Sequence, residues 1–455
     1  MDARFVKTVT DARSIIEERE LDYVKVGVFD IDGVLRGKYL STEKFFSILE
    51  KGFGFCDVVL GWDVNDQLYD TESYTGWANG YADATVVPVI NSCRELPLED
   101  NMLFFLLEFG DRAAHVCPRQ TLKRVLKKAD DMGFAATAAC EYEFFMFEET
   151  PHSIREKNYQ NLTNFTPGFF GYSMLRASVE HEFYEQLLAL CTEMDMPLEG
   201  LHTETGPGVL EAAIAYDEAL KAADKGALFK TFAKILAQKN GLMATFMAKW
   251  SPEYPGQSGH IHLSLAGKDG KSLFHDTSKD HNISDTMRHF IGGQQKLMPE
   301  LLAMIAPTIN SYTRMIPGFW APTEASWGVE NRTCALRAIP GSAKSQRVEY
   351  RIAAADMNPH IAIAAALGSG LWGIENKIEP TAGVKGNAYT QEFPEELALP
   401  KTLWDAAQRL KKSSAARELF GDAFVDHYVV TREWEEREFR KAITDWELKR
   451  YFEII

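Results

Sequence analysis

The stretch FAATAACEYEFFMF at residues 134–147 predicts a long β-strand with two different faces. Side chains alternate between the faces of a strand, so Glu141 and Glu143 share one face and lie roughly 7 Å apart. Two like charges side by side repel each other unless a cation lies between them. This strand therefore predicts a sheet with a candidate cation site on one face.

Two later segments, HIHLSL at 260–265 and RVEYRI at 347–352, alternate in the same way. The polar positions of each segment share one face: His260, His262 and Ser264 in the first, Arg347, Glu349 and Arg351 in the second. A half-exposed sheet would also have one wet face, although such faces usually favour threonine, lysine and mixed residues. Carboxylates with one imidazole suit Mg²⁺ or Mn²⁺ better than zinc, and the arginines suit phosphate or carboxylate binding.

Two further segments add to this set of polar residues. HTETGPGVLE at 202–211 places Glu204 and Glu211 on either side of a Thr-Gly-Pro-Gly turn. Alone it is a loop with two surface glutamates; beside the strands it offers further oxygen ligands. Residues 310–337 are rich in glycine, proline, aromatics and arginines, which favours a loop that closes over a ligand. Carboxylates that bind metal, together with several arginines, are typical of phosphoryl transfer.

The chain order predicts a mixed α+β protein of two domains. Residues up to about 110 consist of short strands and turns, and Pro118 suits the first turn of a helix. We place the boundary near 112, giving domains 1–112 and 113–455. Residues 216–240 have helical spacing, and residues 359–374 predict an apolar, buried helix that begins at Pro359. The strands and helices after residue 112 lack the regular alternation of a doubly wound sheet.

Composition excludes several classes of partner. The 455 residues carry 49 basic and 65 acidic side chains, a net charge of −16. Nucleic acids and anionic membranes both require basic surfaces, so neither is expected as a partner. The six cysteines are scattered, without metal-binding spacing, which favours reduced thiols. Since neither a signal peptide nor a long apolar run is visible, we expect a cytoplasmic protein.

One motif supports a different enzyme class. VFDIDGVLRGK at 28–38 is similar to the Asp-x-Asp-Gly opening of haloacid-dehalogenase phosphatases, with Asp30 as nucleophile and Asp32 as acid/base. It would leave the glutamate strands and the arginines without a role. A strand that runs into a tight turn explains the same residues.

Motifs spread over most of the chain resemble the type I branch of the glutamine synthetase family. They are EYEFFMF (141–147), HTETGPGVLE (202–211), GHIHLSL (259–265), NSYTRMIPGF (310–319), ENRTCALR (330–337), RVEYRIAAADMNPH (347–360) and TDWELKRYFEII at the end. The resemblance implies a small N-terminal β-grasp-like domain and a catalytic domain built on a curved antiparallel sheet. It also implies a homo-oligomer of two stacked hexameric rings, with active sites between neighbouring subunits.

The resemblance also implies roles for single residues. The first metal site corresponds to Glu143, Glu204 and Glu211, and the second to Glu141, His260 and Glu349. The positions that match substrate and nucleotide contacts are Arg314, Arg351 and Gly256 for glutamate, Arg332 for the transferred phosphate, and Ser264, Arg337 and Arg347 for ATP. Two to three Mg²⁺ or Mn²⁺ ions and ATP are therefore expected. ATP would convert the γ-carboxylate of glutamate into an acyl phosphate, which an amine then attacks.

The sequence departs from the family's ammonia-using members at three places. Their Pro-Gly-Tyr-Glu loop reads Pro-Gly-Phe-Trp at 317–320, which replaces a basic carboxylate by the indole of Trp320. An Asp-Gly-Ser-Ser stretch is missing, with Leu-Gly-Trp-Asp at 60–63, where Asp63 is a weak substitute. The Asn-Gly that binds the amino-acid substrate reads Pro255-Gly256.

These departures predict a ligase of the γ-glutamylamide or γ-glutamylpolyamine synthetase kind, which joins glutamate to an organic amine. The apolar rim of Phe319, Trp320 and Trp62 favours a bulky or aromatic monoamine over a polyamine. The alternatives are an ammonia-using glutamine synthetase, a polyamine-specific enzyme and a catalytically silent structural relative. Tyr389 lies near a tyrosine that some bacterial relatives adenylylate; we do not expect that modification here.

Overall fold

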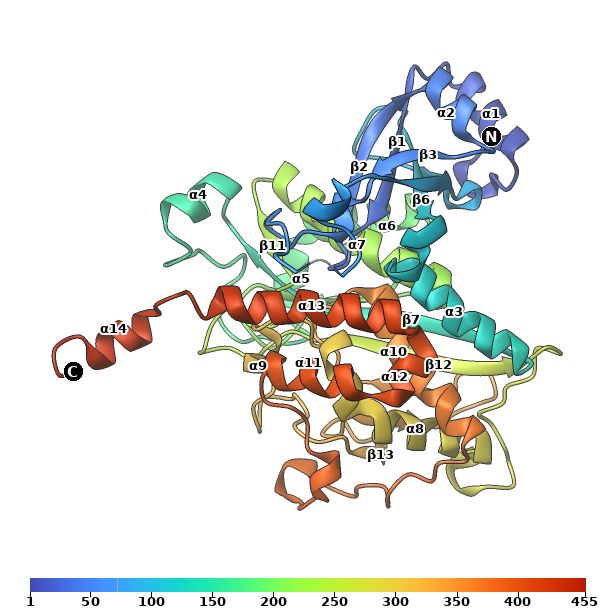
Figure 1. The fold of residues 1–455 in the computed structure, drawn as a ribbon. Helices are drawn as coiled ribbons and strands as arrows, with labels where there is room; N and C mark the ends of the chain where they lie inside the picture. Colours follow the sequence, from blue (N-terminus) through green and yellow to red (C-terminus); the bar gives the residue numbers. More distant parts are fainter. Residues whose placement is uncertain (72) are drawn as a thin grey trace.

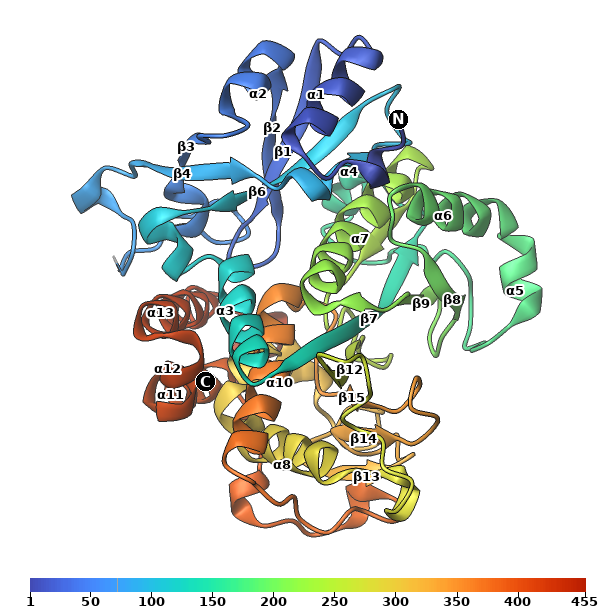
Figure 2. The same ribbon diagram turned by 90° about the vertical axis from the view of Figure 1, so that its right-hand side faces the viewer.

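The computed structural model describes residues 1–71 and 73–455. Two β-sheets with separate hydrophobic cores organise the chain. The sheet formed by residues 23–109 lies at one end of the molecule, and the larger sheet, with most of the helices, forms the remainder (Figures 1 and 2).

The N-terminal sheet has the strand order β2-β1-β6-β4-β3, and β5 pairs with β6. Strands β1 and β6 run parallel at its centre, and the other pairs are antiparallel. The strands are β1 (Tyr23–Phe29), β2 (Leu35–Ser41), β3 (Phe53–Cys56), β4 (Asp83–Pro88), β5 (Arg94–Glu95) and β6 (Leu103–Phe109), with helices α1 (Val9–Glu18) and α2 (Thr42–Ile48). Thr8 and Asp11 form a capping box that begins α1.

The second sheet has the order β13-β14-β15-β12-β7-β9-β8, and β10 and β11 pair with β7. Only the β13–β14 pair is parallel among the described strands of this sheet. The strands are β7 (Phe134–Phe147), β8 (Leu198–Thr203), β9 (Val209–Ile214), β10 (Asp217–Glu218), β11 (Met243–Thr245), β12 (Gly259–Gly267), β13 (Trp327–Val329), β14 (Leu336–Ile339) and β15 (Arg347–Tyr350). The predicted mixed fold with an antiparallel catalytic sheet is confirmed.

Strand β7 explains how this sheet acquires its two faces. Ala138, Cys140, Tyr142 and Phe144 are buried in the core, whereas the side chains between them are only partly buried. The buried face packs against α7 (Ala219–Lys239) and α3 (Pro118–Asp131) (Figure 2). Apolar side chains leave water on the helix side, so the glutamates must point to the opposite side.

The remaining helices complete the core and the C-terminal region. They are α4 (Pro151–Glu156), α5 (Met174–Val179), α6 (His181–Glu193), α8 (Asp285–Leu301), α9 (Ser311–Arg314), α10 (Pro359–Glu375), α11 (Leu403–Lys412), α12 (Ser414–Phe420), α13 (Asp422–Phe439) and α14 (Asp445–Tyr451). Helix α14 extends away from the body of the molecule (Figure 1). No helix in the described part of the chain is long and apolar enough to cross a membrane.

Two details differ from the sequence-based expectations. The segment 347–352 is a strand only as far as Tyr350, because the chain enters a turn at Arg351, although the Arg351 backbone N–H still donates to the carbonyl of Ala335. The predicted helix at 216–240 begins at Ala219, after the short strand β10. The domain boundary near 112 stays a prediction.

Candidate active site

The strand register brings the polar residues of the second sheet into one row. Glu143 of β7 lies opposite Glu211 of β9, and Glu141 lies opposite His260 of β12. On the other side of β12, Glu349 lies opposite both His262 and Arg337. Directly opposite residues share a face, so segments far apart in the sequence form a single charged surface.

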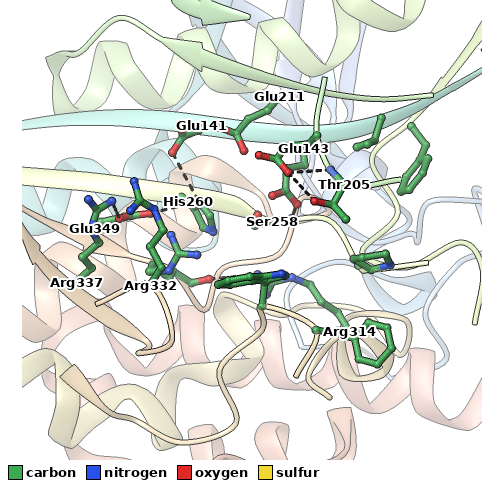
Figure 3. A pocket seen from close by; sticks show the side chains of 18 of the residues that line it. Glu141, Glu143, Thr205, Glu211, Ser258, His260, Arg314, Arg332, Arg337 and Glu349 are labelled. Carbon is green, nitrogen blue, oxygen red and sulfur yellow. Dashed lines mark hydrogen bonds and ion pairs between the residues drawn. The ribbon is translucent and has the colours of Figure 1, made fainter. Parts of the chain in front are cut away.

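This surface forms one wall of a cavity of about 460 Å³. Most of the predicted site residues line it: Glu141, Glu143, Glu204, Glu211, Gly256, His260, Arg314, Trp320, Arg332, Arg337, Glu349 and Arg351. The glutamates of β7 and β9 point into the cavity, and Arg332 and Arg337 lie across from them (Figure 3). The structure thus places metal-ligand and phosphate-binding side chains around the same space.

Two of the predicted ATP contacts do not line this cavity. Ser264 lies further along β12, where its hydroxyl is 2.6 Å from that of Thr137. The Nε of Arg347 donates to Nδ1 of His262 over 3.1 Å. Both residues belong to the same sheet but lie further from the carboxylates. Their contacts with ATP stay predictions.

Among the residues that the structure describes, two groups of side chains bring potential metal-ligand atoms within 4.8 Å of one another. Glu141, His262 and Glu349 form one, and His202, Glu204 and Glu211 form the other. Both contain an imidazole that sequence reasoning left out of its ligand sets. The alternation of HIHLSL placed His262 on the correct face, but nothing in the sequence showed that His202 lies 3.2 Å from the carboxylate of Glu211.

His260 also fits a metal ligand. Its Nδ1 lies 3.6 Å from Glu141 and 3.4 Å from Glu349. Its Nε2 is buried and has no hydrogen-bond partner among the residues that the structure describes. A buried nitrogen without a partner costs free energy. The carboxylates lie on the Nδ1 side of the ring, so Nδ1 is the nitrogen that a divalent cation held with them would meet.

The carboxylates have pKa values that reflect this crowding. Burial, together with the negative charges of Glu141 and Glu143, raises the pKa of Glu211 to about 8 despite its bond to His202. Burial opposes ionisation of Glu349, but His260 and Arg351 outweigh it and lower the pKa to about 2. The cavity thus requires compensating positive charge at its β9 end.

The arginines differ in how firmly they are held. Arg314 is buried, and its guanidinium donates to the carbonyls of Ile352 and Arg351 over 2.9 and 3.2 Å. Arg337 and Arg351 both pair with Glu349. Burial lowers the pKa of Arg314 to about 10, a value at which it stays charged near neutral pH.

Aromatic side chains surround the cavity, and Phe145, Tyr172, Phe319 and Trp320 contribute to its lining. Phe145 lies in the EYEFFMF motif without having been predicted as a site residue. Tyr172 stacks on His202, with ring centroids 4.2 Å apart. The cavity therefore combines a charged floor with an apolar rim.

Trp62 and Asp63 do not line the cavity of their own chain. Arg36 lies over the ring of Trp62, and the Nε1 of Trp434 donates to Asp63. Asp30 and Asp32, the residues of the phosphatase alternative, are also held structurally. The side chain of Asp30 accepts hydrogen bonds from the backbone N–H groups of Asp32 and Val34. These bonds agree with a strand that runs into a tight turn.

Comparison with known proteins agrees with this geometry. The family model for the catalytic domain of glutamine synthetase matches residues 115–451. The chain belongs to the glutamine synthetase family, a family of ATP-dependent carbon–nitrogen ligases. The predicted family and enzyme class are thereby confirmed.

Individual relatives match over nearly the whole chain. A type-1 glutamine synthetase 2 of Dictyostelium discoideum is 44% identical over 95% of this chain and 84% of its own length. A glutamate–isopropylamine ligase of a Pseudomonas species is 36% identical over 99% of both chains. A solved structure of apo GmaS without ligand superposes with a TM-score of 0.85 at 25% identity, covering 98% of this chain and 100% of that one.

Proposed function

We propose that this enzyme phosphorylates the γ-carboxylate of glutamate with ATP and transfers the γ-glutamyl group to an organic amine. The products would be a γ-glutamylamide, ADP and phosphate. A bulky or aromatic monoamine is the favoured substrate. The relative that acts on isopropylamine supports this class of acceptor.

The observation that carries the proposal is the rim of the cavity. Trp320, which stands where the family's ammonia-using members carry a glutamate, lines the cavity beside Phe319 and is 57% exposed. An indole cannot accept the proton of an ammonium ion. It can pack against an alkyl or aromatic group, and a cation can lie over its face. Ammonia has no substituent that could make an apolar contact with such a rim.

The residues of the cavity suit the phosphoryl-transfer step. Two to three Mg²⁺ or Mn²⁺ ions, held by the two carboxylate–imidazole groups, would neutralise charge between ATP and glutamate. Arg314 and Arg351 would hold the carboxylate of glutamate beside Gly256. Arg332 would face the transferred phosphoryl group, and Arg337 the nucleotide phosphates, because a guanidinium can form paired bonds to phosphate oxygens.

An amine panel tests the proposal. Phosphate release from ATP and glutamate would be measured with isopropylamine, 2-phenylethylamine, ethanolamine, putrescine and ammonia, with mass detection of the amide. We expect the highest kcat/KM with a monoamine that has an apolar substituent. The highest value with ammonia would refute the amine ligase, and the highest value with putrescine would favour the polyamine alternative.

We also propose the family's assembly of two stacked hexameric rings. The chain mass is 51.2 kDa, so light scattering should give about twelve times that mass. In such an assembly Trp62 and Asp63 would belong to the site of a neighbouring subunit. A cytoplasmic location and the boundary near 112 remain part of this proposal.

A further inference from the structure

Lys249 is a buried cation beside the cavity that the proposed chemistry leaves without a role. The residue is 6% exposed. Its Nζ is inaccessible and has no hydrogen-bond partner in the described part of the chain. Lysine is rarely buried without a partner, so a specific interaction is expected to offset the loss of water.

The aromatic ring under this ammonium belongs to the rim of the cavity. The Nζ of Lys249 lies over the face of Phe319, 4.7 Å from the ring centroid. A cation over an aromatic face is attracted by the ring quadrupole, and the attraction grows when water is excluded. Phe319 and its neighbour Trp320 both line the cavity.

The loop that carries these aromatics needs an anchor. Gly318 and Trp320 both have positive φ angles, 85° and 59°. Glycine adopts such a conformation freely, whereas a bulky residue is strained there and keeps it only if its surroundings impose it. Because Phe319 lies between them, a contact on its ring fixes the loop at its most strained part.

Lys249 is itself well placed to act as that anchor. Its backbone N–H donates to the side chain of Asn310 over 2.8 Å, and its carbonyl accepts from the same side chain over 2.7 Å. The next residue, Trp250, packs against Phe145 and Phe147 of β7. The lysine is thus fixed both to the segment that precedes α9 and to the central strand of the sheet.

We propose that Lys249 is a positioning residue for amine selection: its ammonium holds the face of Phe319, and with it Trp320, over the cavity. If the loop were released, amines whose substituents reach this rim would bind less well, because only the molecules with the loop in its closed position could bind them. A short amine would lose less. The proposal rests on the amine-ligase function.

The test compares Lys249→Met, Phe319→Leu and the double variant, with Lys249→Arg as the matched control that keeps a cation. For each, kcat/KM is measured for 2-phenylethylamine and for methylamine. Loss of a desolvated cation–π contact predicts that the ratio of the two values falls roughly 5- to 30-fold in each single variant. The double variant should fall no further, and Lys249→Arg should keep most of the wild-type ratio.

Two outcomes would overturn the proposal. An unchanged ratio in Lys249→Met would show that the lysine does not select amines, and multiplication of the two single effects in the double variant would show that the residues act independently. Misfolding would lower kcat/KM for both amines together and leave the ratio of the two values unchanged. If Lys249→Met does not fold, Lys249→Gln replaces it.

A second measurement separates this proposal from the proposed function. If the wild-type enzyme uses ammonia best, the amine-ligase function fails in the wild type itself. Loop anchoring is then judged by the rate of chymotrypsin cleavage after Phe319 and Trp320. Lys249→Met must speed this cleavage and Lys249→Arg must not; equal rates in wild type and Lys249→Met would refute the anchor.

Discussion

Glu211 shows how strongly the cavity constrains a single side chain. It lies directly opposite Glu143 in the sheet and 3.2 Å from His202. Burial and the neighbouring carboxylates raise its pKa to about 8. Ionisation of this carboxyl group is unfavourable in the absence of a cation, so Glu211 is expected to be kept for function.

Replacing Glu211 by Gln should therefore lower kcat/KM roughly 100-fold or more, because the charge that would bind the cation is lost. The assay is phosphate release at saturating ATP and varied Mg²⁺, in which a higher Mg²⁺ requirement should appear. Glu199→Gln is the matched control, since Glu199 is an exposed glutamate of the neighbouring strand β8. Equal activity of the two variants would contradict the assignment of Glu211.

His427 of α13 gives a prediction for the pH dependence of stability. Its Nδ1 lies 2.7 Å from the hydroxyl of Ser73, and burial lowers its pKa from 6.5 to about 4. Between pH 6.5 and 4 the unfolded chain binds the proton more readily, so stability is complete above pH 6.5 and falls as the pH decreases. The loss should reach about 3 kcal/mol.

The unfolding midpoint in urea, measured from pH 7.5 to 4.5, checks this effect. His427→Gln should reduce the decrease in stability on acidification. His152→Gln, which changes an exposed histidine, should leave the decrease as in the wild type. An identical pH dependence in His427→Gln would show that this histidine is not responsible.

At the scale of elements, helices α8 and α10 pack with their backbones in direct contact. A Cβ added to Gly373 would lie 2.3 Å from the carbonyl oxygen of His289, and one added to Gly293 would lie 2.2 Å from that of Ser369. Real Cβ atoms do not approach backbone oxygens so closely. The two glycines therefore permit a packing distance that no other residue would allow.

Gly373→Ala should force these helices apart and destabilise the protein by about 3 kcal/mol or more. Thermal unfolding would measure the loss. Gly200→Ala is the control, because a Cβ there would meet only the Cβ of Ala213 at 3.8 Å, an ordinary contact. If both variants unfold at the same temperature, the close packing of α8 and α10 does not limit stability.

The elements also show which local structure was predictable. Strand β7 extends over residues 134–147 as its alternation predicts, and α10 begins at the predicted Pro359. Strand β15 ends at Tyr350 despite continued alternation, because the chain turns at Arg351 although its N–H still donates to Ala335 beside the end of β14. The alternation of side chains shows the two faces of a strand, but it does not show at which residue the pairing with the neighbouring strand ends.

At the scale of the whole molecule, one buried ion pair joins the C-terminal helices to the N-terminal sheet. Arg432 of α13 pairs with Asp32, in the turn between β1 and β2, and also donates to the carbonyl of Pro307. The arginine side chain is 1% exposed. Removal of Asp32 would leave the buried guanidinium with Glu435, at 3.8 Å, as its acidic neighbour, which compensates the charge less well.

Asp32→Asn should therefore lower the free energy of unfolding by about 3 kcal/mol. Asp66→Asn is the control, because the Asp66 side chain is 57% exposed and Arg36 keeps its pair with Asp30 when Asp66 changes; the loss should stay below about 1 kcal/mol. Urea unfolding compares the two. The phosphatase alternative makes a different prediction, namely an ester hydrolysis that either Asp30→Asn or Asp32→Asn abolishes.

The sequence by itself determined the family, the mixed fold and most residues of the cavity, because alternation on strands and the order of the motifs depend only on local spacing. The tertiary structure alone decided which of these residues meet. The pairing of Glu143 with Glu211, the position of His202 beside that pair and the contact of Lys249 with Phe319 all join distant segments. Such contacts depend on strand register and loop conformation, which the packing of the whole chain fixes.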